Sequence, residues 1–173
     1  MEQICVKPMS FKMIQETAQK LRELVGAENN YEFPVLQFVE WILCNPESGI
    51  QLEIVPVSEM NGMYGLTNTN SDVLKIREDA YLGAYKGNPR DIFTLCHEVG
   101  HYFLHQPARV EFARGDIPAY RNPEWQANAF AACLMAPYNL VKDMSAEEIA
   151  AKCNMSLQAA NIHRKNLNKH YGV

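Results

Sequence analysis

The chain has 173 residues, of which 47% are hydrophobic, and its net charge is −4 at pH 7. This length and composition favour one globular domain, or one domain with a small appendage. The acidic balance argues against a surface that binds nucleic acid or an anionic membrane. The five cysteines are scattered and never form CxxC, which indicates free thiols rather than disulfides or a zinc knuckle. The sequence shows neither a signal-like N-terminus nor an apolar run of about 20 residues, so we expect a cytoplasmic protein.

The first part of the chain, residues 1–48, predicts two helices. One begins after Ser10, a favourable N-cap, and ends at Gly26, and the other spans residues 34–44. Their apolar residues recur at helical spacing. We therefore expect both helices to contribute packing rather than chemistry.

Residues 50–85 predict a small antiparallel sheet. The candidate strands are residues 51–57, 63–67 and 73–77, with the turn signal Asn61-Gly62 after the first strand, while residues 80–85 fit neither pattern. An exposed edge of such a sheet offers unpaired backbone groups to which an extended peptide can add as a further strand.

Residues 88–105 predict a helix that carries the pattern HExxH. Each helical residue turns about 100°, so His101 lies only about 40° from His97, one turn on, and both imidazoles can reach one metal ion. Glu98 lies about 60° beyond His101, where it can serve as general base toward a metal-bound water without binding the metal. The opposite side of the helix is apolar and should face the core; its residues are Ile92, Leu95, Cys96, Val99 and Phe103.

Residues 106–121 show no periodicity and predict a long loop. Such loops are often functional, so we expect a lid or a specificity loop. The helix that follows, residues 122–136, has Asn122 as its N-cap and is apolar on nearly all sides, which indicates burial.

Glu124 lies in the first turn of this second helix. An unpaired buried charge is costly, and either a metal ion or the positive end of the helix dipole could compensate it. With His97 and His101, Glu124 would complete a three-ligand site whose fourth position stays open, as in catalytic zinc sites.

The segments HEVGHYFLH (97–105) and EWQANAFAACLMAP (124–137) together resemble the ImmA/IrrE family of zinc metallopeptidases, which pair HExxH with a later helix E-x-x-A-N-x-F-A. The resemblance implies an α+β, zincin-like fold, in which the small sheet packs against the HExxH helix and the following buried helix. It implies one Zn²⁺ ion held by His97, His101 and Glu124, with Glu98 as the catalytic base. It further implies a protein substrate, a helix-turn-helix repressor or regulator of the kind found in phages and mobile elements.

Five further residues are candidates for supporting the metal ligands or for stabilising the transition state. Asn128 could hydrogen-bond the outer nitrogen of a ligand histidine, and His105 continues the histidine face of its helix as a supporting or structural residue. Tyr64, Tyr120 and Arg90 are alternative candidates for stabilising the transition state, and the sequence does not choose between them.

Residues 141–173 predict a helical appendage to a metallopeptidase domain of residues 1–140. Ser145 begins a capping box and Ser156 caps a second helix, which makes the pair similar to a helix-turn-helix. DNA binding is therefore the alternative function, although five Lys/Arg against three Asp/Glu in residues 139–173 is a weak balance for a surface that follows phosphates. A metal-binding scaffold without turnover is a third possibility. The oligomeric state is not predicted.

Overall fold

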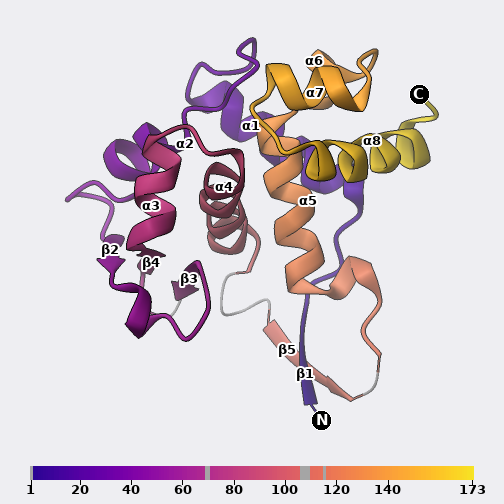
Figure 1. Cartoon of the computed structure of the whole chain (residues 1–173). Helices are drawn as coiled ribbons and strands as arrows, with labels where there is room; N and C mark the ends of the chain where they lie inside the picture. Colours follow the sequence, from indigo (N-terminus) through magenta and orange to yellow (C-terminus); the bar gives the residue numbers. More distant parts are fainter. Residues whose placement is uncertain (1, 69–70, 106–109, 115) are drawn as a thin grey trace.

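Two helices, α4 (Pro89–Leu104) and α5 (Pro123–Met135), form the centre of the fold in the computed structural model (Figure 1). The structure describes residues 2–68, 71–105, 110–114 and 116–173. A three-stranded sheet and α3 (Glu78–Tyr85) pack on one side of α4, and α1 (Phe11–Leu24) packs against α5. This arrangement confirms the predicted α+β class.

The caps of both central helices are those that the sequence predicts. Oδ1 of Asn88 accepts a hydrogen bond from the backbone N–H of Arg90 at 3.0 Å. Oδ1 of Asn122 accepts one from the backbone N–H of Trp125, also at 3.0 Å. Proline follows each cap and takes the first helical position. The apolar face of α4 is turned to the core: Leu95, Cys96 and Val99 are buried, and Ile92 and Phe103 are half-buried.

Gly100, inside the HExxH pattern, lies where the two central helices cross. A Cβ atom at this position would lie 3.3 Å from the backbone of Ala127 and 3.1 Å from the ring of Phe130. These contacts are tight for a side chain, so glycine permits the close crossing. The first turns of α5 are thereby held next to the histidines of α4.

The sheet is mixed, so the antiparallel prediction is wrong for one of its two pairings. Its order is β2 (Gln51–Val55), β4 (Val73–Arg77), β3 (Gly65–Asn68), with β2 parallel and β3 antiparallel to β4. The three strands alternate in direction along the chain, but β4 inserts between the other two. The first and third strands therefore become neighbours that run the same way, and β3 becomes an edge strand that lies against α4.

Two strands and a helix are among the elements that were not predicted. The strand β1 (Glu2–Val6) pairs antiparallel with β5 (Val110–Arg114), and α3 occupies the residues that fitted neither pattern. Because β5 lies inside residues 106–121, the prediction of a continuous loop there is wrong. Residues 106–109 and 115 lie outside the described residues, so the suggested lid stays untested.

The other predicted helix of the N-terminal part forms as α2 (Val35–Gln37) and continues directly into a π-helix, η1 (Phe38–Leu43). Ser10 caps α1 and accepts from the backbone of Met13 at 3.2 Å. Each helix buries part of its apolar surface in the main core, including Ile14 and Val35, but Leu24, Trp41 and Ile42 are exposed.

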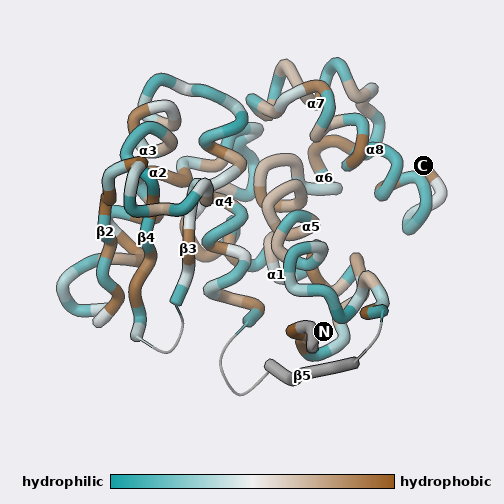
Figure 2. The backbone as a smooth tube through the Cα atoms, turned by 60° about the horizontal axis from the view of Figure 1, so that its bottom comes forward, coloured by the Kyte–Doolittle hydropathy of each residue, from teal (hydrophilic) through white to brown (hydrophobic). Residues whose placement is uncertain are grey.

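The C-terminal part consists of α6 (Tyr138–Val141), α7 (Ala146–Lys152) and α8 (Leu157–Tyr171). The capping box at Ser145 and the cap at Ser156 both form. Buried residues of α7 and α8 belong to the same hydrophobic core as α1, α4 and α5, and Figure 2 shows α5 mainly in apolar shades beyond its first turns. The division of the chain at residue 140 stays a prediction.

None of the helices in the described part of the chain is both long enough and apolar enough to cross a membrane.

Candidate metal centre

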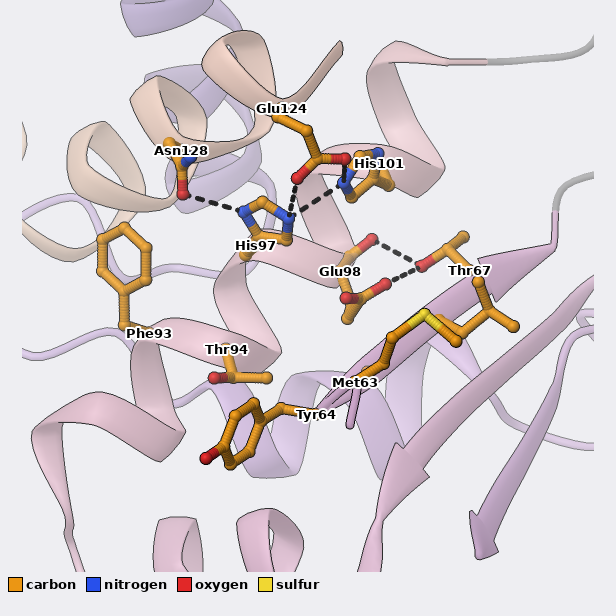
Figure 3. A pocket seen from close by; sticks show the side chains of 12 residues that line it. Met63, Tyr64, Thr67, Phe93, Thr94, His97, Glu98, His101, Glu124 and Asn128 are labelled. Atoms are coloured by element: carbon orange, nitrogen blue, oxygen red, sulfur yellow. Dashed lines mark hydrogen bonds and ion pairs between the residues drawn. The ribbon is translucent and has the colours of Figure 1, made fainter. Parts of the chain in front are cut away.

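Two histidines of α4 and one acid of α5 point into the same cavity (Figure 3). Nε2 of His97 lies 3.3 Å from Oε2 of Glu124, and Nε2 of His101 lies 3.3 Å from Oε1 of the same carboxylate. The two Nε2 atoms are 2.9 Å apart, and one ligand atom from each of the three residues lies within 4.8 Å of the others. The three side chains are therefore close enough to bind one metal ion.

A buried glutamine determines which ring nitrogen of His105, the neighbour of His101, carries the proton. The amide Nε2 of Gln126 donates to the backbone oxygens of Lys7 (2.9 Å) and Tyr120 (2.8 Å). Its Oε1 therefore faces His105 and accepts a hydrogen bond from Nε2–H of that ring at 3.1 Å. Burial lowers the pKa of His105 to about 4, so this imidazole is neutral and its Nδ1 carries a lone pair.

Each histidine of the cluster also has an outer partner that can accept a hydrogen bond from Nδ1–H in the tautomer that binds a metal ion through Nε2. In that tautomer, Nδ1–H of His101 donates to Nδ1 of His105 at 2.9 Å, and Nδ1–H of His97 donates to Oδ1 of Asn128 at 3.1 Å. Two lone pairs and a carboxylate that converge repel one another unless a cation lies among them. Two imidazoles, each with an outer hydrogen-bond partner, and one carboxylate are a donor set that fits a divalent metal ion.

The carboxylate of Glu124 is ionised at neutral pH. In the metal-free protein, hydrogen bonds donated by Nε2–H of His101 and of His97 hold the pKa of this carboxyl well below the ordinary value. Its place in the first turn of α5 adds the favourable field of the helix N-terminus. The sequence predicts a buried charge at Glu124, but its side chain is 65% exposed, and the groups next to it are the two histidines.

Glu98 borders the same cavity but is held by the sheet. It is 5% exposed, and burial raises the pKa of its carboxyl. Oγ1 of Thr67, on β3, donates to Oε2 of Glu98 at 2.7 Å. A Cβ at Gly65 would lie 2.5 Å from Cγ of Glu98, so the strand backbone presses directly on the acid. Sequence reasoning missed both β3 residues, and their spacing of two, which places them on one face of a strand, was the available signal.

The cavity has a volume of about 540 Å³, and Tyr64 is part of its lining. Two guanidinium groups lie over the Tyr64 ring, that of Arg77 at 3.7 Å and that of Arg90 at 4.3 Å from its centroid. In Figure 3 the Tyr64 hydroxyl points away from His97. Arg90 is thus near the site through its contact with Tyr64 and does not line this cavity in the described structure.

Tyr120 is not brought to the metal cavity. Its side chain is 51% exposed and lines a different cavity, beside Lys169 of α8. Its backbone oxygen nevertheless accepts the hydrogen bond from Gln126 described above. Tyr120 belongs to η4 (Ala119–Arg121), and the structure places its side chain on the side of α8, away from the histidine cluster.

The basic residues of α8 mostly take part in packing rather than forming an open charged surface. His163 is fully buried and donates to the carbonyl that ends α5 at 2.8 Å. Arg164 donates to a backbone carbonyl at the end of α6 at 2.7 Å, and the ring of His170 stacks on a phenyl ring of α1. Lys165 and Lys169 are exposed. This geometry argues against the DNA-binding alternative.

A comparison with protein-family models gives a match over residues 47–164, to the peptidase family M78, described as the IrrE N-terminal-like domain. The matched range is more than half of the chain and contains β2 to β4, the cluster of His97, His101 and Glu124, and about half of α8. No curated protein and no solved structure matches the chain.

Proposed function

Since the chain belongs to the M78 peptidase family of IrrE N-terminal-like domains, we propose that it is a zinc-dependent endopeptidase. One observation carries this proposal: the convergence of His97, His101 and Glu124 on a single point, with Glu98 in the same cavity. A peptidase of this type needs a metal with an open position and a base beside it, and these four residues supply both.

His97 and His101 would hold the ion through Nε2, and Glu124 through its carboxylate. Imidazole and carboxylate ligands suit zinc, which prefers four-coordinate sites. When bound, zinc supplies a Lewis acid for the scissile carbonyl and lowers the pKa of water at the open position. Asn128 and His105 support the ion indirectly, because each holds the Nδ1 proton of one ligand histidine.

Glu98 is the proposed catalytic base. Its raised pKa makes the carboxylate a better proton acceptor than an exposed glutamate. Thr67 holds Oε2, which leaves Oε1 to take the proton of the attacking water and to pass it to the leaving amine. Gly65 leaves the room that this carboxylate occupies.

The proposed substrate is a helix-turn-helix repressor or regulator, as the resemblance to ImmA/IrrE peptidases implies. One feature of the fold supports a peptide substrate in general. The strand β3 is a sheet edge and its residues line the metal cavity, so an extended segment can pair with its backbone. A cytoplasmic location is part of the same proposal, because such regulators act on DNA inside the cell.

The proposal is tested by co-expressing the chain with the helix-turn-helix regulator encoded beside it. Wild type and Glu98→Gln are compared, and fragments are measured by gel and mass spectrometry. We expect fragments with wild type alone and the same zinc content in both proteins. Cleavage by the pure variant would remove Glu98 as the base. Stoichiometric zinc without cleavage of any candidate regulator would favour the scaffold without turnover.

A further inference from the structure

A second cavity adjoins the metal cavity on the side of α8. It has a volume of about 530 Å³ and is bordered by α4, α5 and α8. Phe93, Thr94 and Asn128 line both cavities, so the two lie directly next to each other. We call the second one the α8 cavity. Its volume is in the range of sites that enclose organic ligands.

Six of the twelve residues that line the α8 cavity are apolar, and five of the other six are polar but uncharged. The apolar residues are Phe93, Trp125, Ala129, Ala132, Ala159 and Ile162. Ala129 and Ala132 are buried, whereas Ile162 is 57% exposed. Along α8, residues such as Ala160 and Leu167 face the core, while Ala159 and Ile162 form a separate stripe on the cavity side. The helix therefore presents apolar surface to an open space next to the metal cluster.

The charges around the two cavities differ. The metal cavity carries the carboxyls of Glu98 and Glu124. Among the described residues that line the α8 cavity, Arg90 alone is charged, and its guanidinium already lies over the ring of Tyr64. A basic side chain would find no carboxylate in this lining, and an acidic one would compete with an existing contact. An uncharged apolar group fits the cavity best.

We propose that the α8 cavity binds a large apolar side chain, aromatic or branched aliphatic, of the peptide that is cleaved at the metal centre. The inference rests on the proposed function and adds a specificity site to it. A peptide lying across His97 passes the residues that both cavities share, so a side chain beside the scissile bond can enter the α8 cavity. In this account α8 is part of the substrate site.

The chain offers a spectroscopic probe of this cavity. It has two tryptophans: Trp125 lines the α8 cavity, and Trp41, in η1, is 70% exposed. The variant Trp41→Phe therefore leaves Trp125 as the one source of indole fluorescence. Zinc-loaded Trp41→Phe protein is titrated with acetohydroxamate and with phenylalkyl hydroxamates whose linkers have one to four methylene groups. The hydroxamate binds zinc, and the phenyl group tests the cavity.

We expect the best phenylalkyl hydroxamate to bind at least about ten-fold more tightly than acetohydroxamate and to change the emission of Trp125. In an Ala159→Phe background, which fills the cavity from the partly exposed α8, this gain should disappear while acetohydroxamate binds as before. The matched control is Asn161→Phe, an exposed position on the same helix that does not line the cavity, and it should keep the gain. Thermal melts show that the variants are folded.

The results separate this inference from the proposed function. Binding of zinc and acetohydroxamate without any gain from the phenyl group would overturn the inference and leave the metal centre intact. If the protein binds no zinc, the proposed function fails, and the cavity is tested with 4-phenylbutanamide, which has no metal-binding group. A Trp125 response that Ala159→Phe abolishes and Asn161→Phe preserves would support the cavity. No response would overturn it.

Discussion

The metal cavity has two walls, a sheet wall formed by β3 and an α5 wall formed by the start of α5. One carboxyl group lies at each wall, and the two differ in burial and in the direction of their pKa shift. On the sheet wall, Glu98 is pressed against β3, is 5% exposed, and has its pKa raised by burial. On the α5 wall, the side chain of Glu124 is 65% exposed, and the neighbouring histidines hold its pKa well below the ordinary value. Two carboxyls whose pKa values are pushed apart suit different tasks. The buried one can accept a proton, and the exposed one stays ionised as a ligand.

The largest expected contrast between the walls is in zinc affinity. Glu124→Ala removes the proposed third ligand and should weaken zinc binding by more than about 100-fold, which exceeds the usual effect of losing an outer hydrogen-bond partner. Glu98→Gln should keep zinc affinity within a few-fold, because its carboxyl lies outside the ligand cluster. Competition with a chromophoric chelator measures both variants. Equal zinc affinities in Glu124→Ala and wild type would exclude this acid as a ligand.

The sheet wall is tested by Gly65→Ala. The added Cβ would lie 2.5 Å from Cγ of Glu98, so the acid must move, and a displacement of about 1 Å can cost about 100-fold in rate. We expect cleavage of the regulator to slow by about that factor while zinc affinity is unchanged. A variant that cleaves at the wild-type rate would show that the position of Glu98 is not critical.

Low pH can reduce the stability of the fold as well as protonate groups of the metal cavity, and the two effects must be measured separately. His163 is fully buried, and burial lowers its pKa to about 4, below the ordinary value of about 6.5. The unfolded chain then binds a proton more readily than the native one. The stabilisation is complete above about pH 6.5 and is lost as the pH falls toward 4, by about 2–3 kcal/mol.

Replacing this group, His163→Gln, should remove that part of the pH dependence. The free energy of unfolding is measured with urea on zinc-free protein at pH 7.5 and 4.5, for wild type and variant. We expect wild type to lose about 2–3 kcal/mol more than the variant between the two values. Parallel losses in the two proteins would show that His163 does not contribute.

The smallest expected effects come from removing one hydrogen-bond partner on each wall, Asn128 on the α5 wall and Thr67 on the sheet wall. Asn128→Ala frees the Nδ1 proton of His97 and should weaken zinc binding by about ten-fold. Thr67→Val removes the hydroxyl that holds Glu98 and should slow cleavage without changing zinc affinity. Isothermal titration with zinc, followed by a cleavage assay, distinguishes the two. An effect of Thr67→Val on zinc affinity would mean that the walls do not act separately.

The α5 wall was largely predictable from sequence, and the sheet wall was not. Helical periodicity alone puts His97 and His101 on one face, and the cap at Asn122 puts Glu124 in the first turn of its helix. The contacts of Gly65 and Thr67 with Glu98 depend on β3 being the strand next to α4, which follows from strand order. Strand order is a non-local property that periodicity does not encode.

The same reason explains the other differences. The strands β1 and β5 pair across more than a hundred residues, and such a non-local pairing is not encoded in the periodicity of either segment. Tyr120 was a reasonable candidate by residue type, but the 3₁₀ turn η4 directs it to another cavity. Gln126, which sets the proton of His105, was predictable only as a buried polar residue that needs partners.

The central claim is that one metal ion binds between the two walls and that the two acids act differently toward it. The most direct measurement is a crystal structure of the zinc-loaded protein with anomalous data collected at the zinc edge. We predict one peak, about 2.0–2.2 Å from Nε2 of His97, Nε2 of His101 and a carboxylate oxygen of Glu124, with Glu98 not coordinated. A peak elsewhere, or a coordination sphere without Glu124, would contradict the account.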